Sequence, residues 1–149
     1  MSIIRITKEF NFEAAHALWN YKDLCKNIHG HSYRLLVTVT GIPITNKNNS
    51  KYGMLMDFND LKAIVKKNII DVFDHSLIIF KEANTEALKT TGQMFNRLIL
   101  TDYQPTCENM VNDFALRIKK LLPTNVKLHN LKLFETVTSY AEWFAEDNL

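Results

Sequence analysis

Residues 29–41 read HGHSYRLLVTVTG and predict a long β-strand. Every odd position is histidine or apolar, and the even positions are small or polar with the exception of Leu36. A period of two is typical of a strand that buries one face. Gly41 and Pro43 are expected to end this strand.

Segment 3–16 predicts a second strand with the same pattern. The positions that share its apolar side are Phe10, Phe12, Ala14 and His16. The alternating positions Glu9, Asn11 and Glu13 are polar. We expect the two strands to pair as antiparallel neighbours through an irregular connection, with their patterned faces on the same side of the sheet.

Two amphipathic helices are predicted further along the chain. The first begins at Asp57, a good N-cap, and continues with apolar residues at three- and four-residue spacing to near Asp74. The second follows Pro105, with Thr106 as its cap, and Pro123 closes it.

Segments 126–136 and 138–144 predict two further strands. Segment 81–104 has no clear period and allows short helices around Glu82–Lys89 and Met94–Leu98. This order of elements favours an α+β fold over residues 1–149 as a single domain, with an antiparallel sheet and both helices on one face.

The composition indicates an ordinary globular chain. Of 149 residues, 46% are hydrophobic and 23% charged, which excludes a disordered or collagen-like protein. No apolar run approaches the ~20 residues of a membrane span, and no signal peptide is recognisable. Two cysteines far apart favour a reduced, cytoplasmic protein. A net charge of +2 gives no case for a nucleic-acid or membrane partner.

Three of the five histidines lie between positions 16 and 31. His29 and His31 point to the same side of their strand, and His16 lies on the matching side of the preceding one. Three neutral imidazoles without a fourth protein ligand are typical of a catalytic zinc site, which keeps one position for water or substrate. The alternative is that each histidine is a hydrogen-bonded core residue.

Cys25, four positions before His29, admits three interpretations. As a fourth ligand it would close the site and make it structural. As a free thiol beside a metal it would serve as a base or nucleophile. As a small buried hydrophobe it would have no role in chemistry.

Three carboxylates complete the set of candidates. Asp74 next to His75 forms a possible proton-transfer unit, or only a polar helix exit. Glu135, at the end of an apolar run, suits the amino-pyrimidinone edge of a pterin or guanine, or is an exposed strand-end charge. Glu108 is explained by the helix dipole alone.

Together these residues resemble the 6-pyruvoyl-tetrahydropterin synthase / 6-carboxy-tetrahydropterin synthase family. The likeness covers most of the chain. Its blocks are Phe12-Glu13-Ala14-Ala15-His16, Cys25-x-x-x-His29-Gly30-His31-Ser32, Asp57-Phe58-x-x-Leu61-Lys62, Asp74-His75, Pro105-Thr106-x-Glu108-Asn109 and Glu135-Thr136. Each block is short, and their joint order and spacing are specific.

The resemblance implies the tunnelling fold, a four-stranded antiparallel sheet with two helices on one side. It implies that three subunits join their sheets into a barrel and that two trimers stack into a homohexamer. The active sites would then lie at subunit interfaces.

The resemblance also implies site roles. Zinc would bind His16, His29 and His31, and Cys25 would abstract a proton with Asp74 and His75 as the acid/base relay. Glu135 would anchor the pterin ring, and Glu108 and Thr106 would line the same pocket. The implied substrate is 7,8-dihydroneopterin triphosphate.

The cysteine block looks like that of the bacterial queuosine-pathway enzymes. These form 6-carboxy-tetrahydropterin with loss of acetaldehyde, whereas the biopterin-pathway enzymes make the 6-pyruvoyl product. Segment 81–104 is longer than the usual connection in the bacterial form, which leaves the product open.

Overall fold

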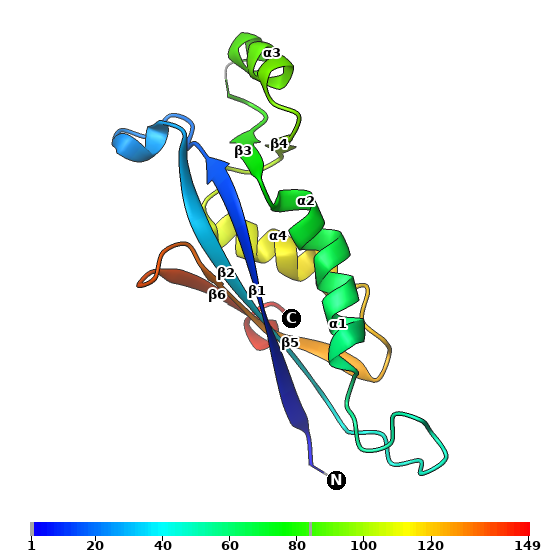
Figure 1. Ribbon diagram of the computed structural model, residues 1–149. Helices are drawn as coiled ribbons and strands as arrows, with labels where there is room; N and C mark the ends of the chain where they lie inside the picture. Colours follow the sequence, from blue (N-terminus) through cyan, green and yellow to red (C-terminus); the bar gives the residue numbers. More distant parts are fainter. Residues whose placement is uncertain (1, 84) are drawn as a thin grey trace.

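The computed structural model describes residues 2–83 and 85–149. Within these residues the strands form one sheet in the order β4-β3-β1-β2-β5-β6 (Figure 1). The strands are β1 Ile4–His16, β2 His29–Gly41, β3 Ser76–Phe80, β4 Leu98–Thr101, β5 Val126–Phe134 and β6 Tyr140–Phe144. The four strands expected from the sequence are all present.

The expected four-stranded antiparallel sheet is nevertheless wrong. Strands β1, β2, β5 and β6 pair antiparallel in the order β1-β2-β5-β6, but β3 adds to β1 in parallel and β4 adds to β3 in parallel. The sheet is therefore mixed and six-stranded. Leu77–Phe80 is a continuous apolar run without alternation, which is typical of a parallel strand covered on both faces.

The first predicted helix is a continuous helical run. It comprises α1 Phe58–Val65, the π-helical turn η2 Lys66–Ile70 and α2 Asp71–Phe73. The Asp57 carboxylate accepts the hydrogen bond of the Asn59 amide, and Asp74 is the C-terminal cap, so both predicted ends are confirmed.

The second predicted helix is α4 Cys107–Lys119. The Thr106 hydroxyl accepts a hydrogen bond from the Asn109 amide, as expected of the N-cap. Segment 81–104 instead differs from expectation. One helix, α3 Thr85–Met94, occupies its first half, and β4 begins at Leu98, so the second short helix is wrong. Short 3₁₀ turns are η1 Leu24–Lys26 and η3 Ala145–Asp147.

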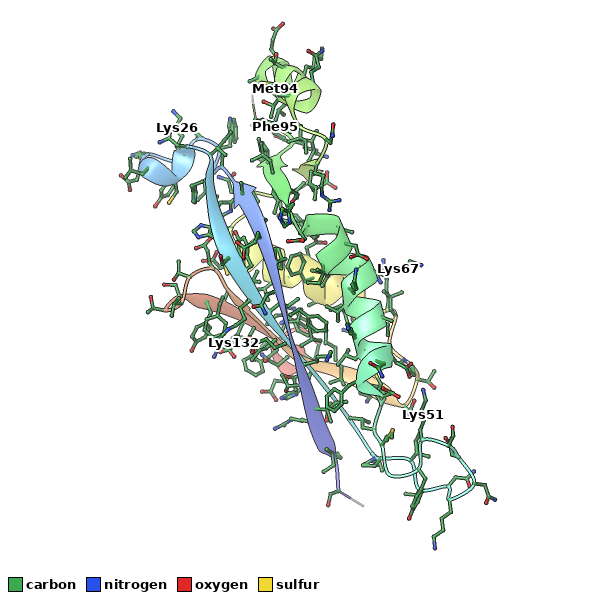
Figure 2. The ribbon with its side chains drawn as sticks, viewed as in Figure 1. Lys26, Lys51, Lys67, Met94, Phe95 and Lys132 are labelled. Atoms are coloured by element: carbon green, nitrogen blue, oxygen red, sulfur yellow. The ribbon has the colours of Figure 1, made fainter. Side chains whose placement is uncertain are left out.

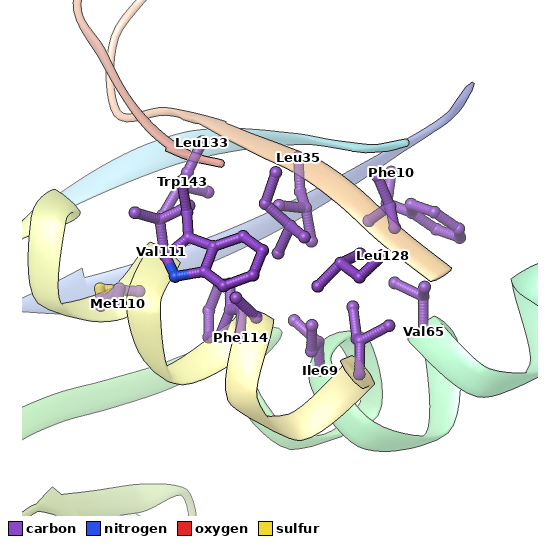
Figure 3. Packing of buried hydrophobic residues seen from close by; sticks show 14 of the residues in the cluster. Phe10, Leu35, Val65, Ile69, Met110, Val111, Phe114, Leu128, Leu133 and Trp143 are labelled. Atoms are coloured by element: carbon purple, nitrogen blue, oxygen red, sulfur yellow. The ribbon is translucent and has the colours of Figure 1, made fainter. Parts of the chain in front are cut away.

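The main core lies between one face of the sheet and the α1–α2 run with α4 (Figures 1 and 3). Phe114 of α4 lies at its centre, with ring-centroid distances of 6.0 Å to Phe12 and 4.9 Å to Phe73. A smaller cluster of Leu77, Ile79 and Leu88 lies between the β3 strand and α3. Among the described residues, no helix has both the length and the apolar character that a membrane crossing requires.

Candidate metal centre

The pairing of β1 with β2 brings three histidines together on the core face of the sheet. His16 is directly opposite His29, and His31 is opposite Ala14, so all three rings share one side as expected. One ring nitrogen of each lies within 4.8 Å of the others. We call His16, His29 and His31 the histidine triad.

Two backbone carbonyls fix the orientation of the rings. His16 Nδ1 lies 2.7 Å from the Pro105 carbonyl oxygen, and His29 Nδ1 lies 2.8 Å from that of Asn27. A carbonyl oxygen only accepts, so both Nδ1 atoms carry the proton, and each Nε2 of the neutral ring is left as a lone-pair donor to a metal. This is the outer-shell arrangement usual for metal-binding histidines.

With the proton on Nδ1 of both rings, the Nε2 atoms of His16 and His29 face each other and neither carries a hydrogen. His16 Nε2 and His29 Nε2 are 2.9 Å apart, a distance at which two lone pairs repel unless a cation lies between them. Within the part of the chain that the structure describes, His31 Nε2 is buried and has no hydrogen-bond partner. Both observations fit a site built to hold a metal ion.

Burial favours the uncharged form of two histidines of the triad, His16 and His31. Desolvation lowers the pKa of His16 to about 4 and also lowers the pKa of His31. Both imidazoles are therefore neutral near pH 7, which is the form that binds a metal.

Glu135 contacts the triad within the same chain. Its Oε1 atom lies 3.6 Å from His16 Nε2 and 3.7 Å from His31 Nε2. The β5–β6 turn holds it there, because the Glu135 amide donates to the Ser139 carbonyl. Sequence reasoning placed Glu135 at a pterin ring and missed this proximity, which depends on how the β5–β6 hairpin turns over the triad.

Cys25 lies in η1 on the connection between β1 and β2, and it is exposed. Its thiol is outside the group of mutually close ligand atoms, so the structure does not present it as a fourth ligand. Gln104 holds the start of this connection through two hydrogen bonds to the Trp19 backbone, at 3.0 and 2.8 Å. The Leu18 amide, near the start of the connection, donates a hydrogen bond to the Cys25 carbonyl and so ties the two parts of the connection together.

Asp74 and His75 form the contacting pair that the sequence suggested. Asp74 Oδ2 lies 2.9 Å from His75 Nδ1, and Asp74 Oδ1 accepts a 2.9 Å hydrogen bond from the Glu13 amide. That backbone hydrogen bond is the main cause that lowers the pKa of the Asp74 carboxyl. The His75 side chain is 75% exposed.

The pair lies beside the triad strands but outside the triad itself. His75 shares a hollow of about 400 Å³ with Glu13, Gly30 and Ser32, and His31 of the triad also lines it. The His75 imidazole is not among the mutually close ligand atoms of the described residues, so it is not presented as a metal ligand.

Thr106 and Glu108 lie next to Pro105, whose carbonyl holds His16. The Thr106 hydroxyl caps α4, and Glu108 is exposed in the first turn of that helix. Their expected contact with a ligand stays a prediction.

Backbone and long-range contacts were beyond sequence reasoning. The carbonyls of Pro105 and Asn27 hold two triad rings, and the Gln104 side-chain amide holds the connection after β1. The two carbonyls carry no local sequence signal. Gln104 precedes the Pro-Thr block directly, which is the one sequence cue available for it.

Comparisons with known proteins point to one protein family. The sequence model described as 6-pyruvoyl tetrahydropterin synthase matches residues 5–146. A 6-carboxy-5,6,7,8-tetrahydropterin synthase from Haemophilus influenzae is 34% identical over 143 residues, covering 95% of this chain and 99% of that protein. The enzyme of the same name from Aquifex aeolicus is 31% identical, with 95% and 98% covered.

Solved structures show the same fold. A 6-pyruvoyl tetrahydropterin synthase from Caenorhabditis elegans superposes with a TM-score of 0.68 at 22% identity, covering 97% of both chains. An uncharacterised protein from Wolinella succinogenes reaches a TM-score of 0.78 at 20% identity, covering 97% of this chain and 99% of that one. At these identities the likeness concerns the fold alone.

Proposed function

The chain belongs to the 6-pyruvoyl tetrahydropterin synthase family, and from that premise we propose that it is a 6-carboxy-5,6,7,8-tetrahydropterin synthase. The reaction converts 7,8-dihydroneopterin triphosphate to 6-carboxy-5,6,7,8-tetrahydropterin, with loss of acetaldehyde and triphosphate, in the queuosine pathway. The observation that carries the proposal is the convergence of three imidazoles beside Glu135. The names of the bacterial relatives favour this product.

We propose zinc as the metal. Three imidazole ligands with a further position left open suit a catalytic zinc ion. When bound, zinc would act as a Lewis acid toward the side-chain hydroxyls of the substrate and make the neighbouring protons more acidic. His16, His29 and His31 would hold it, with the Pro105 and Asn27 carbonyls orienting two of the rings.

The remaining residues would bind the substrate and move its protons. Cys25 acts as the proton-abstracting group, because its thiol is exposed on a connection that ends at the triad. Asp74 holds the His75 imidazole in one tautomer as the partner acid/base. Glu135 accepts from the amino-pyrimidinone edge of the pterin, and Thr106 and Glu108 line the same pocket.

The exposure of the relay supports a composite active site. Because the His75 side chain is 75% exposed and its imidazole is outside the group of close ligand atoms, we propose that a neighbouring subunit supplies the His75 that serves each triad. The edge strands β4 and β6 leave the sheet open at both ends, which supports the tunnelling-fold assembly of three sheets into a barrel and of two trimers into a homohexamer.

Each subunit would then be one domain of this family over residues 1–149. We place it in the cytoplasm, because both cysteines are free thiols, as is typical of a reducing compartment. Pterin triphosphate is its expected partner, without nucleic acid or membrane.

Product identification tests the proposal. Zinc-loaded protein incubated with 7,8-dihydroneopterin triphosphate should release 6-carboxy-5,6,7,8-tetrahydropterin and acetaldehyde, measured by mass spectrometry. If only the 6-pyruvoyl product forms, the chain belongs to the biopterin branch. If the substrate binds without turnover, it is a non-catalytic pterin-binding homologue.

The two cysteines provide a matched pair of variants. Cys25→Ala should keep the metal and abolish turnover, whereas Cys107→Ala, which alters a buried thiol beside the Leu133 carbonyl, should retain turnover. Loss of metal from Cys25→Ala would contradict the proposed role of the thiol as a base.

A further inference from the structure

We propose that Arg97 is a positioning residue that fixes the Asp74–His75 pair in the geometry needed for proton transfer. Only the catalytic role of the pair rests on the proposed function, and the effect of Arg97 on the geometry of the pair does not. Arg97 belongs to segment 81–104, to which sequence reasoning could assign no role.

The Arg97 side chain bridges two elements that are distant in sequence. The residue lies between α3 and β4, and its carbonyl accepts a 2.9 Å hydrogen bond from the Leu77 amide of β3. From this fixed position Nη2 donates to the Asp71 carbonyl at 2.7 Å and to the Val72 carbonyl at 3.0 Å.

These two carbonyls belong to the last turn of the helical run over residues 58–73. Carbonyls at a helix end have no partner inside the helix and carry partial negative charge, so an arginine there supplies both hydrogen bonds and the complementary charge. Arg97 therefore holds the backbone directly before Asp74. The chain leaves the helix immediately afterwards, because Asp74 is extended.

His75 follows in a conformation that needs external support. Its φ of 56° lies in the left-handed region, which is unusual for a residue with a side chain. Such a conformation is unfavourable for a residue with a side chain and persists only when its surroundings enforce it. On one side Glu13 enforces it, since its amide donates to Asp74 and its carbonyl accepts from the His75 amide.

Arg97 supplies the constraint from the other side. With Glu13 holding the pair to β1 and Arg97 holding the helix end to the start of β4, the turn is fixed at both flanks. The guanidinium charge also contributes to the lowered pKa of the Asp74 carboxyl, after the Glu13 hydrogen bond and the contact with His75. Asp74 thus stays ionised and accepts a hydrogen bond from His75 Nδ1–H.

The same segment forms a wall beside His75. His75 and Arg97 line a hollow of about 470 Å³ together with Leu77, Met94 and Phe95. Met94 and Phe95 lie at the α3 end of the molecule (Figure 2). Lys26, which belongs to the connection between β1 and β2 that carries Cys25, lies at the same end. Displacing Arg97 would therefore alter both the backbone of the pair and the space next to its imidazole.

The tautomer of His75 tests the inference without substrate. In protein labelled with ¹⁵N-histidine, the imidazole ¹⁵N shifts distinguish the Nδ1–H from the Nε2–H tautomer. The wild type should show the Nδ1–H form that Asp74 accepts, and Arg97→Ala should move toward the mixture of free imidazole. Arg97→Lys, which keeps a cation and a donor, should restore most of the wild-type shift. Unchanged shifts in a folded Arg97→Ala protein would overturn the inference.

Lys89→Ala is the matched control, because Lys89 is an exposed cation on α3 in the same segment. It should leave the His75 shifts unchanged, and an equal change in this variant would also overturn the inference. If Arg97→Ala does not fold, Arg97→Gln takes its place, and its shifts should lie between those of the wild type and free imidazole.

Kinetics separate positioning from substrate binding. If the proposed function holds, Arg97→Ala should lower kcat by about tenfold, a partial loss of an acid/base contribution of 10²–10⁴, with KM changed less than about twofold. A raised KM with unchanged kcat would overturn the inference, because Arg97 would then bind the substrate. Absence of turnover in the wild type would refute the proposed function and leave the tautomer experiment intact.

Discussion

The His31→Ala variant removes one of the three imidazoles of the triad. The His31 side chain is 18% exposed, and its Nε2 atom is buried without a hydrogen-bond partner among the described residues. Truncation loses ring packing, including a 5.6 Å centroid contact with Tyr33, but it also removes a buried unpaired nitrogen worth about 1–3 kcal/mol. We therefore expect little change in the stability of the metal-free protein.

Metal affinity should instead fall steeply. Structural zinc binding is worth about 10–16 kcal/mol, so one of four ligand positions is worth about 2.5–4 kcal/mol, or about 10²–10³-fold in Kd. At about 100 times the wild-type Kd, zinc stabilises the wild type by about 2.7 kcal/mol, and a 100-fold weaker site gains only about 0.4 kcal/mol. The difference of about 2.3 kcal/mol corresponds to about 5–9 °C in Tm for a chain of this size.

Thermal melts with and without zinc measure this loss. His129→Ala is the control, because His129 lies on β5 outside the triad. The wild type and His129→Ala should gain Tm on addition of zinc, and His31→Ala should gain almost none. An undiminished gain in His31→Ala would refute the assignment of the site.

Three further outcomes follow from the structure. Glu135→Gln removes the negative charge beside the triad, so zinc affinity in a chelator competition should fall about tenfold. Unchanged affinity would show that the carboxylate does not interact with the bound ion. Burial raises the pKa of Cys107 to about 11, so alkylation at pH 8 should label exposed Cys25 and reach Cys107 only near pH 11 or after unfolding; equal labelling at pH 8 would contradict this. Gly41→Ala would place a Cβ atom 2.6 Å from the Asn125 carbonyl oxygen, so urea unfolding should show a loss of about 1–3 kcal/mol, and full stability would contradict the packing.

The elements with a clear period were predictable. β1 and β2 alternate over most of their length, and the side-chain oxygens of Asp57 and Thr106 mark the starts of two helices, so their bounds agree closely with the structure. β3 was missed because a strand buried on both faces has no alternation. The short strand β4 was read as helix for a related reason, since its pairing with β3 is a tertiary contact.

The candidate site divides in the same way. The parity of the two strands predicts the triad, because pairing with matched faces brings three imidazoles together. The approach of Glu135 depends on the β5–β6 turn, and the contact of Arg97 spans more than twenty residues of chain. Neither can be read from local spacing, since both depend on how distant elements pack.

X-ray absorption at the zinc edge, combined with metal analysis, tests the central claim most directly. The account predicts one zinc per chain with three imidazole nitrogens at about 2.0–2.1 Å, a further light oxygen or nitrogen ligand, and no sulfur. A sulfur neighbour at about 2.3 Å would mean that Cys25 closes the site. That result, or protein that binds no zinc, would contradict an open catalytic centre.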